Sequence, residues 1–513
     1  MKKALFLSLF FAFSAMAHAQ NDERALAAAI DSIVRIYTEA DIVNKFVDEI
    51  FEKHKSAYLA TRIAKSYYNY NKVDPPVFRD FHRRDTVNSF KYINRSIAID
   101  PKYAEAYILA SDILSYEKAS TGGREEAMLW LNRGIAANPT DSSLYIASAE
   151  VLAFSDEAAA VAKLEELRKQ DPNFPVDLQL GRMYYRLYDH GGSIDELMEF
   201  IKKMVVYYGK VNKEIMTIGD LSAYAMSLQF TNNFDECYEV SSYALEKAPD
   251  DFGLNGFLLS AAVRLKKWNE SIKAANKLMQ IEPNKVTPVQ YIQYGSALSG
   301  AKRYDEALKQ FDHVLNMEEA SENNKATANN QINNTIVAMC DEHVKMGEYS
   351  EAFSMYEKYI AERRAAGHLD AYLIGMYANA YVEQSKELNG EERIDVLLKA
   401  DRIYEMLVQE VPSSDIVGTF YRFSIRKSID SDNERGLLLP MAEQLVSLIL
   451  SKPQGEIDKH INRLADAYMQ MLRYYAIVKT NKPKALEYAD KILELDPTNS
   501  SALKIKEIYG RRR

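Results

Sequence analysis

The side chains that could do chemistry are scattered along the chain and do not form the spacings of catalytic or metal sites. The chain has 8 histidines, and those after His18 are His54, His82, His190, His313, His343, His368 and His460. None has the H-E-x-x-H spacing that puts two metal ligands on one helix face. No G-x-S-x-G or G-x-x-x-x-G-K-S/T segment marks a nucleophile or a phosphate loop. The sequence therefore predicts that the protein is not an enzyme and uses no metal or cofactor.

Two other groups of reactive residues point to structure instead of catalysis. The pair Glu125-Glu126 opens a helical segment, where acidic side chains favour the helix dipole. Cys237 and Cys340 are the 2 cysteines of the chain. They fall on small-residue positions of separate helical units, whereas a disulfide needs Cα atoms within ~7 Å. We expect two buried free thiols.

Helical periodicity is what positions these side chains, because apolar residues recur at i, i+3, i+4 and i+7 through most of the chain. The pattern is clearest from Asp251 to Pro283, where two apolar segments flank a polar turn and end at a proline. The preceding unit ends at Pro249, so the period is 283 − 249 = 34 residues. Other units stop at Pro101, Pro139, Pro172, Pro412 and Pro497. This recurrence indicates a stack of helix-turn-helix units.

A helix-turn-helix unit of this length resembles the tetratricopeptide repeat (TPR). The residues at the family's characteristic positions are Tyr291, Tyr294, Gly295, Leu298, Tyr304, Ala307, Phe311 and Val314. Small Gly295 and Ala307 would let two helices approach closely, while the aromatic rings fill the space beside them. The resemblance implies an all-α fold, a right-handed α-solenoid (superhelix) of about eleven TPR-like helical hairpins.

The segment 1–19 has the pattern of a secretory signal peptide. Met1-Lys2-Lys3 is basic, Ala4 to Ala15 is apolar, and Ala17-His18-Ala19 is an A-x-A cleavage signal. No cysteine lies near the cut, and no later stretch reaches ~18 uninterrupted apolar residues. We expect the protein to be exported and, after signal peptide removal, to be periplasmic or outer-membrane-associated without direct membrane insertion.

The rest of the chain divides into a repeat array and its ends. We expect N-terminal capping helices at 20–55 and a TPR-like repeat array at 56–411. Divergent TPR-like repeats follow at 412–499, and a C-terminal capping helix with a basic tail at 500–513. Polar caps are what the ends of a helical solenoid require. The register of the repeats in 414–480 is left open, because this stretch fits the family least well.

The charge balance narrows the class of partner. Without Lys2 and Lys3 the chain has 64 − 2 = 62 basic against 73 acidic residues, a net charge of 62 − 73 = −11. This balance opposes nonspecific binding to nucleic acid and charge-driven docking on an anionic membrane. The expected partner is therefore another protein or a peptide segment. The oligomeric state is left open.

In the TPR family the first helix of each unit lines the concave face, so the resemblance implies a candidate partner-binding groove. Its residues are Ile108, Asp112, Ile146, Glu150, Ser222, Met226, Gly256, Ser260, Ile292, Ser296, Val337, Asp341, Gly375 and Asn379. They are mostly small, apolar or neutral, which suits an extended or helical peptide held by shape. The same residues could instead pack against the interior of the superhelix, and the sequence leaves both possibilities open.

These features predict a non-enzymatic protein-binding scaffold or adaptor that uses the concave face of a TPR superhelix, in bacterial envelope assembly or secretion. The alternative is a glycan-binding outer-membrane-associated TPR protein of the starch-utilisation type, in which exposed aromatic rings stack on sugars. Exposed Tyr and Trp residues in one loop cluster would favour the glycan. A continuous groove of small residues would favour the protein.

Overall fold

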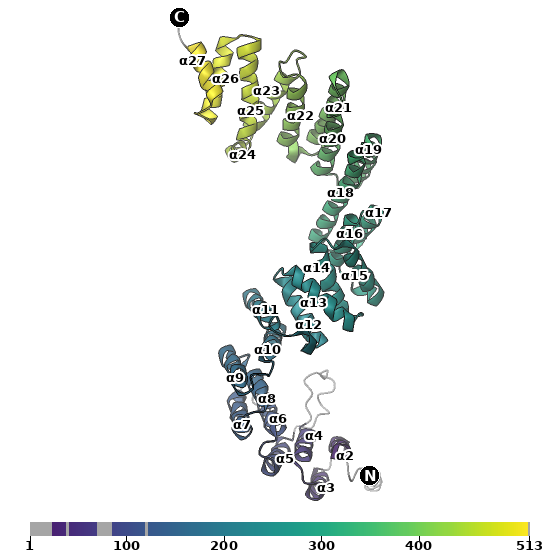
Figure 1. The fold of residues 1–513 in the computed structure, drawn as a ribbon, viewed down its shortest axis with the longest axis vertical. Helices are drawn as coiled ribbons and strands as arrows, with labels where there is room; N and C mark the ends of the chain where they lie inside the picture. Colours follow the sequence, from purple (N-terminus) through teal and green to yellow (C-terminus); the bar gives the residue numbers. More distant parts are fainter. Residues whose placement is uncertain (1–22, 37–39, 69–84, 118–121, 511–513) are drawn as a thin grey trace. The chain divides into compact units, whose positions relative to one another are not determined.

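The computed structural model describes residues 23–36, 40–68, 85–117 and 122–510, and every regular element within these ranges is a helix (Figure 1). The predicted signal peptide, 1–19, and the basic end of the tail, 511–513, lie outside the described residues. The chain splits into two compact units, 1–257 and 258–513.

The helices follow one another with short turns. The first unit contains α2 (Glu23–Ile36), α3 (Ala40–Lys53), α4 (Ala57–Tyr67), α5 (Thr86–Ile99), α6 (Ala104–Glu117), α7 (Gly123–Ala137), α8 (Ser142–Leu152), α9 (Glu157–Gln170), α10 (Val176–His190), α11 (Ile194–Tyr208), α12 (Ile218–Phe230) and α13 (Phe234–Lys247), and α14 (Phe252–Arg264) begins in it. The second unit contains α15 (Trp268–Ile281), α16 (Pro288–Gly300), α17 (Tyr304–Asn316), α18 (Glu322–Lys345), α19 (Tyr349–Ala365), α20 (Ala371–Ser385), α21 (Gly390–Glu410), α22 (Asp415–Ile429), α23 (Leu438–Leu450), α24 (Gln454–Lys459), α25 (Ile461–Arg473), α26 (Lys482–Leu495) and α27 (Ser500–Gly510).

Consecutive helices pack together as hairpins. In the first unit α4 packs on α5, α6 on α7, α8 on α9, α10 on α11 and α12 on α13; in the second, α16 packs on α17, α18 on α19, α20 on α21 and α25 on α26. The first helix of one hairpin also contacts the first helix of the next, as in α4 with α6, α6 with α8, α16 with α18 and α18 with α20. α22 also packs on α23, so the described residues show five such hairpins within each unit. The predicted all-α array of helical hairpins is confirmed.

The turn inside a hairpin depends on a residue in the left-handed conformation. Asn232, Lys266 and Lys302 have φ of 59°, 57° and 63°, and each follows the first helix of its hairpin. In each case the N–H of the next residue bonds to a carbonyl five residues earlier, at 2.8 to 2.9 Å. This bond closes the helix end in the manner of a Schellman motif. Asn232 and Lys266 are 266 − 232 = 34 residues apart, so the turn recurs with the repeat.

Glycines let the two helices of a hairpin approach closely. A Cβ at Gly295 of α16 would lie 2.5 Å from the ring of Phe311 in α17, and Phe311 is fully buried. Gly181 of α10 has the same relation to Tyr208 of α11, at 2.7 Å. The large ring of the second helix therefore occupies the volume that a side chain on the first helix would need.

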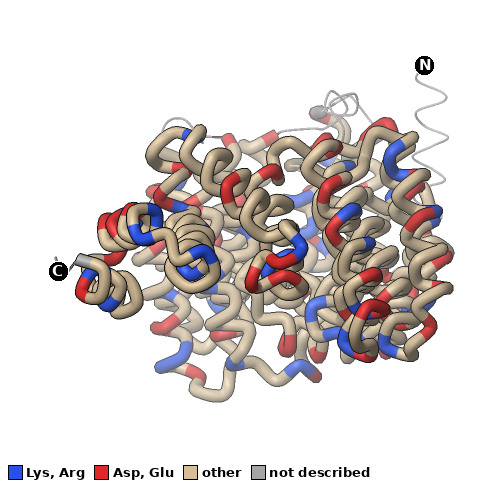
Figure 2. Tube along the Cα trace, turned by 90° about the horizontal axis from the view of Figure 1, so that it is seen from above, with Lys and Arg blue, Asp and Glu red and all other residues tan. Residues whose placement is uncertain are grey.

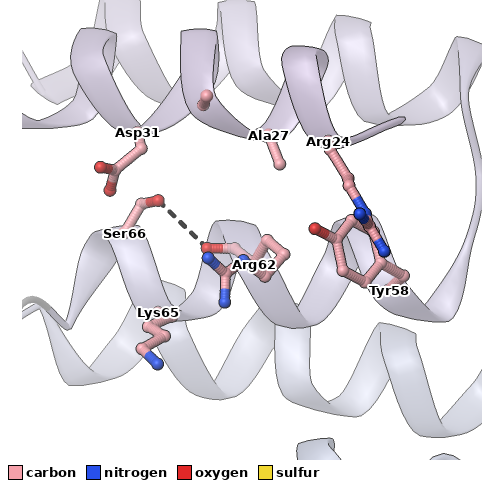
Figure 3. A pocket seen from close by; sticks show the side chains of 8 residues that line it. Arg24, Ala27, Asp31, Tyr58, Arg62, Lys65 and Ser66 are labelled. Carbon is pink, nitrogen blue, oxygen red and sulfur yellow. Dashed lines mark hydrogen bonds between the residues drawn. The ribbon is translucent and has the colours of Figure 1, made fainter. Parts of the chain in front are cut away.

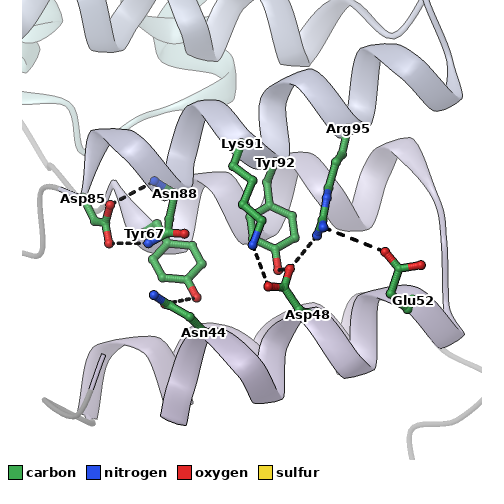
Figure 4. A network of polar contacts seen from close by, with 9 residues as sticks. All are labelled: Asn44, Asp48, Glu52, Tyr67, Asp85, Asn88, Lys91, Tyr92 and Arg95. Atoms are coloured by element: carbon green, nitrogen blue, oxygen red, sulfur yellow. Dashed lines mark hydrogen bonds and ion pairs between the residues drawn. The ribbon is translucent and has the colours of Figure 1, made fainter. Parts of the chain in front are cut away.

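The N-terminal helices share this packing. α2 and α3 contribute to one hydrophobic core with α4, α5 and α6. Asp48 of α3 accepts hydrogen bonds from Lys91, Tyr92 and Arg95 of α5 at 2.5, 2.7 and 2.6 Å (Figure 4). Burial alone would raise the pKa of Asp48, but these three donors hold that pKa below its ordinary value. The segment expected to cap the array is thus bonded to its first hairpin.

The stretch whose register the sequence left open, 414–480, departs from the simple repeat. The short helix α24 separates α23 from α25, and a π-helical turn, Tyr474–Val478, follows α25. α25 still packs on α23 and α26, and α27 packs on α26. No helix in the described ranges combines the length and the apolarity that crossing a membrane requires. Cys237 and Cys340 are both buried and unbridged, as predicted.

Candidate partner-binding face

The candidate groove residues lie in pairs on first helices. α6 carries Ile108 and Asp112, α8 Ile146 and Glu150, α12 Ser222 and Met226, α14 Gly256 and Ser260, α16 Ile292 and Ser296, α18 Val337 and Asp341, and α20 Gly375 and Asn379. Members of a pair are four residues apart, so they share one side of their helix. Within each unit, we call the surface made by these positions on the first helices the first-helix face.

The residues of the first-helix face differ in exposure. Ser260, Ile292 and Val337 are buried, at 7%, 9% and 3% exposed. Asp112 and Glu150 are exposed, and the remaining residues are half-buried. The three buried residues therefore pack inside the array, which is the second possibility that the sequence left open. The half-buried and exposed residues keep surface that a partner could touch.

Polar side chains of the first-helix face form contacts between hairpins. Glu150 of α8 forms an ion pair with Arg186 of α10. The Ser260 hydroxyl accepts a hydrogen bond from Nε2 of Gln293 in α16 at 3.2 Å. The partners are 186 − 150 = 36 and 293 − 260 = 33 residues apart, so each contact joins one repeat to the next. Part of the hydrogen-bonding capacity of this face is therefore used within the protein.

The first-helix face of the first unit is hollowed between α10, α12 and α14. The cavity has a volume of 310 Å³ and is lined by Arg182, Tyr185, Tyr208, Thr217, Gly219, Asp220, Ser222, Ala223, Met226 and Phe257. Ser222 and Met226 belong to the candidate groove. Arg182 and Tyr185 are not among the predicted groove residues, although Gly181 beside them marks α10 as a first helix with its own outward positions.

An ion pair closes one side of this cavity. Arg182 donates from Nε to Oδ1 of Asp220 and from Nη2 to Oδ2, each at 2.7 Å. Thr217 donates to the same carboxylate from its backbone N–H at 2.9 Å and from its hydroxyl at 2.6 Å, which caps α12. Burial opposes ionisation of Asp220, yet these donors hold its pKa below the ordinary value. The charges of Arg182 and Asp220 therefore compensate each other at neutral pH.

Tyr208 supplies a phenol at the wall of the cavity. Its ring is packed against Gly181 and the residue is 1% exposed. Its hydroxyl makes no hydrogen bond within the described ranges, and it is not among the fully enclosed unpaired polar atoms there, so it keeps some accessible surface. Burial raises the pKa of Tyr208, so its hydroxyl keeps its proton at neutral pH and remains a donor.

Another hollow, of 390 Å³, lies between α2 and α4. It is lined by Arg24, Ala27, Ala28, Asp31, Tyr58, Arg62, Lys65 and Ser66. Figure 3 shows Arg24 beside the Tyr58 ring and Asp31 near Ser66, at opposite ends of the hollow. Nη1 of Arg62 lies 3.8 Å from Oε1 of Glu105 in α6. Three cations against one lining carboxylate make this end of the array locally basic in a chain that is acidic as a whole.

The placement of metal-binding side chains and the distribution of charge bear on the kind of site that the described residues could form. There, no three His, Cys, Asp or Glu side chains are placed so that they could hold a metal ion. Figure 2 shows Lys and Arg interspersed with Asp and Glu along the trace. Such a surface favours recognition by shape and local pockets over recognition by a field of one charge.

No family model matches the chain, and no curated protein matches it. Among solved structures it is similar to the C-terminal part of a TPR repeat-containing protein from Cytophaga hutchinsonii, with 19% identity over 55% of this chain and 98% of that chain and a TM-score of 0.36. It is also similar to the TPR domain of P58(IPK), with 11% identity over 83% and 95% of the two chains and a TM-score of 0.23. A structure of Naa15/Naa10 bound to HypK-THB matches with 14% identity over 94% and 66% and a TM-score of 0.27. The first two are TPR proteins by name. The packing of this chain's own helices shows its repeat architecture.

Proposed function

We propose that this chain is a non-enzymatic scaffold that binds another protein through its first-helix face. The observation that carries the proposal is the hollow between α10, α12 and α14, where Ser222 and Met226 meet aromatic side chains of neighbouring helices. A repeat array offers a long surface built from many hairpins, which suits a macromolecular partner. Pockets lined by aromatic and apolar side chains are where protein interfaces concentrate binding energy.

We also propose that the scaffold acts outside the cytoplasm, in bacterial envelope assembly or secretion. The basic, apolar and A-x-A segments within 1–19 support export. Mass spectrometry of the protein isolated from its native cells is expected to show Gln20 as the first residue. A mature protein that still begins at Met1 would contradict export.

Photo-crosslinking in intact cells tests the binding face. A photoreactive amino acid at Met226 is expected to capture a discrete protein partner, because Met226 is half-buried and lines the hollow. Ser260 is a poorer position because it is buried.

The matched control is the same photoreactive amino acid at Glu246, an exposed residue of α13, which is a second helix. A species captured at Met226 and absent at Glu246 supports the proposal. Equal capture at both positions, or none at Met226, would count against binding through the first-helix face.

The glycan-binding alternative has less support in the described residues. Trp130 and Trp268 are half-buried and lie on α7 and α15, so they do not form an exposed loop cluster. Tyr372 and Tyr421, which are 49% and 43% exposed, also lie on helices. We therefore retain a protein as the proposed partner.

A further inference from the structure

We propose that the cavity between α10, α12 and α14 is an anchor pocket for a neutral side chain with an apolar body and a hydrogen-bonding tip, best met by a tyrosine of the partner. This inference rests on the proposed function, because it names the chemistry that the partner must offer to the first-helix face. It follows from three properties of the cavity: its apolar walls, the Tyr208 hydroxyl that makes no hydrogen bond to the described residues, and its compensated charge.

The walls of the cavity are largely apolar. Met226 and Ala223 of α12, Tyr185 of α10 and Phe257 of α14 line it. At 310 Å³ the cavity is at the small end of ligand pockets, which suits a single side chain better than a whole cofactor. The aromatic rings of Tyr185 and Phe257 favour an aromatic occupant, because offset and edge-to-face ring contacts add to the gain from burial.

The hydroxyl of Tyr208 is free to bond with a group that enters the cavity. Tyr208 is 1% exposed and lines the cavity, and its backbone carbonyl accepts from the Val211 N–H at 3.0 Å, but its hydroxyl makes no hydrogen bond to the residues that the structure describes. Buried polar groups are nearly always hydrogen-bonded, and an unpaired one is a sign of a water or a ligand group. By contrast, the buried Tyr184 and Tyr224 donate to Glu157 at 2.8 Å and to Glu236 at 2.5 Å. A polar tip in the cavity would complete the same arrangement at Tyr208.

The charge at the cavity favours a neutral tip. Arg182 is held by Asp220 through two bonds of 2.7 Å, and nearby Arg186 is paired with Glu150. A carboxylate in the cavity would be repelled by Asp220, and no free cation would compensate its charge. An ammonium would likewise be repelled by Arg182, and no free anion would compensate its charge. A phenol carries one hydroxyl that can both donate and accept, so it matches the Tyr208 hydroxyl without bringing charge.

A sugar fits these walls less well than a phenol. A pyranose has hydroxyls around its ring, and those facing Met226, Ala223 and Phe257 would lose water without gaining a hydrogen bond. A phenol has one polar end and an otherwise apolar body. The cavity likewise has the Tyr208 hydroxyl at its wall and largely apolar walls elsewhere.

Saturation-transfer NMR on the full mature chain tests the pocket with defined probes. We expect 4-methylphenol, the side-chain analogue of tyrosine, to bind more tightly than toluene, and methyl α-glucopyranoside not to bind. Tyr208→Phe should weaken binding of 4-methylphenol about fivefold, the usual effect of one neutral hydrogen bond, and leave toluene unchanged. Met226→Trp, which fills the cavity, should abolish binding of both aromatic probes.

The control is Tyr243→Phe in α13, which removes the same hydroxyl from a tyrosine outside the cavity and should leave all binding unchanged. Circular dichroism shows whether each variant is folded. Binding of 4-methylphenol that is absent, or equal in the wild type and Tyr208→Phe, would overturn the proposal. Binding of the glucoside at this site would also overturn it and would favour a glycan ligand.

The pocket proposal and the proposed function can be rejected independently of each other. If a partner is crosslinked at Met226 but 4-methylphenol does not bind, the scaffold proposal is supported and the tyrosine-anchor proposal is rejected. Probe binding that depends on Tyr208, with no partner captured at Met226, would support the pocket chemistry and count against the scaffold.

Discussion

Two glycines in first helices of the second unit allow a matched test of how tightly the hairpins pack. A Cβ at Gly295 of α16 would stand 2.5 Å from Cε1 of Phe311, 2.7 Å from Cζ and 2.9 Å from Cδ1. A Cβ at Gly375 of α20 would meet nothing within 4 Å. The same change to alanine is therefore expected to have opposite effects on stability at the two positions.

The magnitudes follow from helix propensity and from the clash. Alanine is favoured over glycine in a helix interior, so Gly375→Ala should raise the free energy of unfolding by about 0.5–1 kcal/mol. At Gly295 this gain is opposed by a fully buried ring that must move. Overpacking a core costs about 1–3 kcal/mol, so Gly295→Ala should lower the free energy of unfolding by about 1–2 kcal/mol net.

Hydrogen exchange followed by mass spectrometry measures both effects locally, which is needed because a repeat array can open in parts. Amides of α16 should exchange about 5- to 30-fold faster in Gly295→Ala, and amides of α20 about 2- to 5-fold slower in Gly375→Ala. Urea midpoints from circular dichroism should move in the same directions. Slower amide exchange of α16 in Gly295→Ala would contradict the packing argument, because it would show that the Phe311 ring does not set the spacing of this hairpin.

Three further predictions concern polar and turn residues. Asp220→Asn should lower the free energy of unfolding at neutral pH. Because the pKa of Asp220 in the folded chain lies below its ordinary value of 3.8, the stability difference between wild type and variant should be present above pH 3.8 and disappear as the pH falls through the folded pKa. Urea midpoints measured across this pH range test the prediction. Burial raises the pKa of Cys237 to about 11 and of Cys340 to about 12. Ellman's reagent should therefore label both thiols slowly in the folded chain at mildly alkaline pH and rapidly in urea. Rapid labelling without urea would contradict their burial. Lys266→Gly should raise the urea midpoint, because a glycine removes the steric cost, about 1 kcal/mol, of a side chain at φ 57°; a lowered midpoint would show that this turn is not strained.

The hairpin array could be predicted because its signals are local. Apolar spacing, stop prolines and the small residue at Gly295 all act within one repeat, and they recur every 34 residues in the best-matched units. Turn residues such as Asn232 and Lys266 follow the same period. The stretch 414–480 was harder to place, because α24 and the π-helical turn after α25 add residues that no repeat pattern anticipates.

The candidate site could be predicted only in part. Helical spacing places Ser222 and Met226 on one side of a helix, but it does not show which outward residues remain available. Glu150 bonds to Arg186 and Ser260 to Gln293, in both cases a side chain of the following repeat. Such contacts join side chains of successive repeats, so the spacing within one hairpin does not reveal them.

The sequence by itself determined that this chain is a row of helical hairpins, because helix formation, turn geometry and close approach at glycine depend on residues near one another in the chain. Only the tertiary structure decided where that row is hollow. The cavity exists because the ring of Tyr208 lies against Gly181, Arg182 reaches across to Asp220 on the next first helix, and Phe257 closes the space from a third. Each of these contacts depends on how whole helices are spaced, which no single segment specifies.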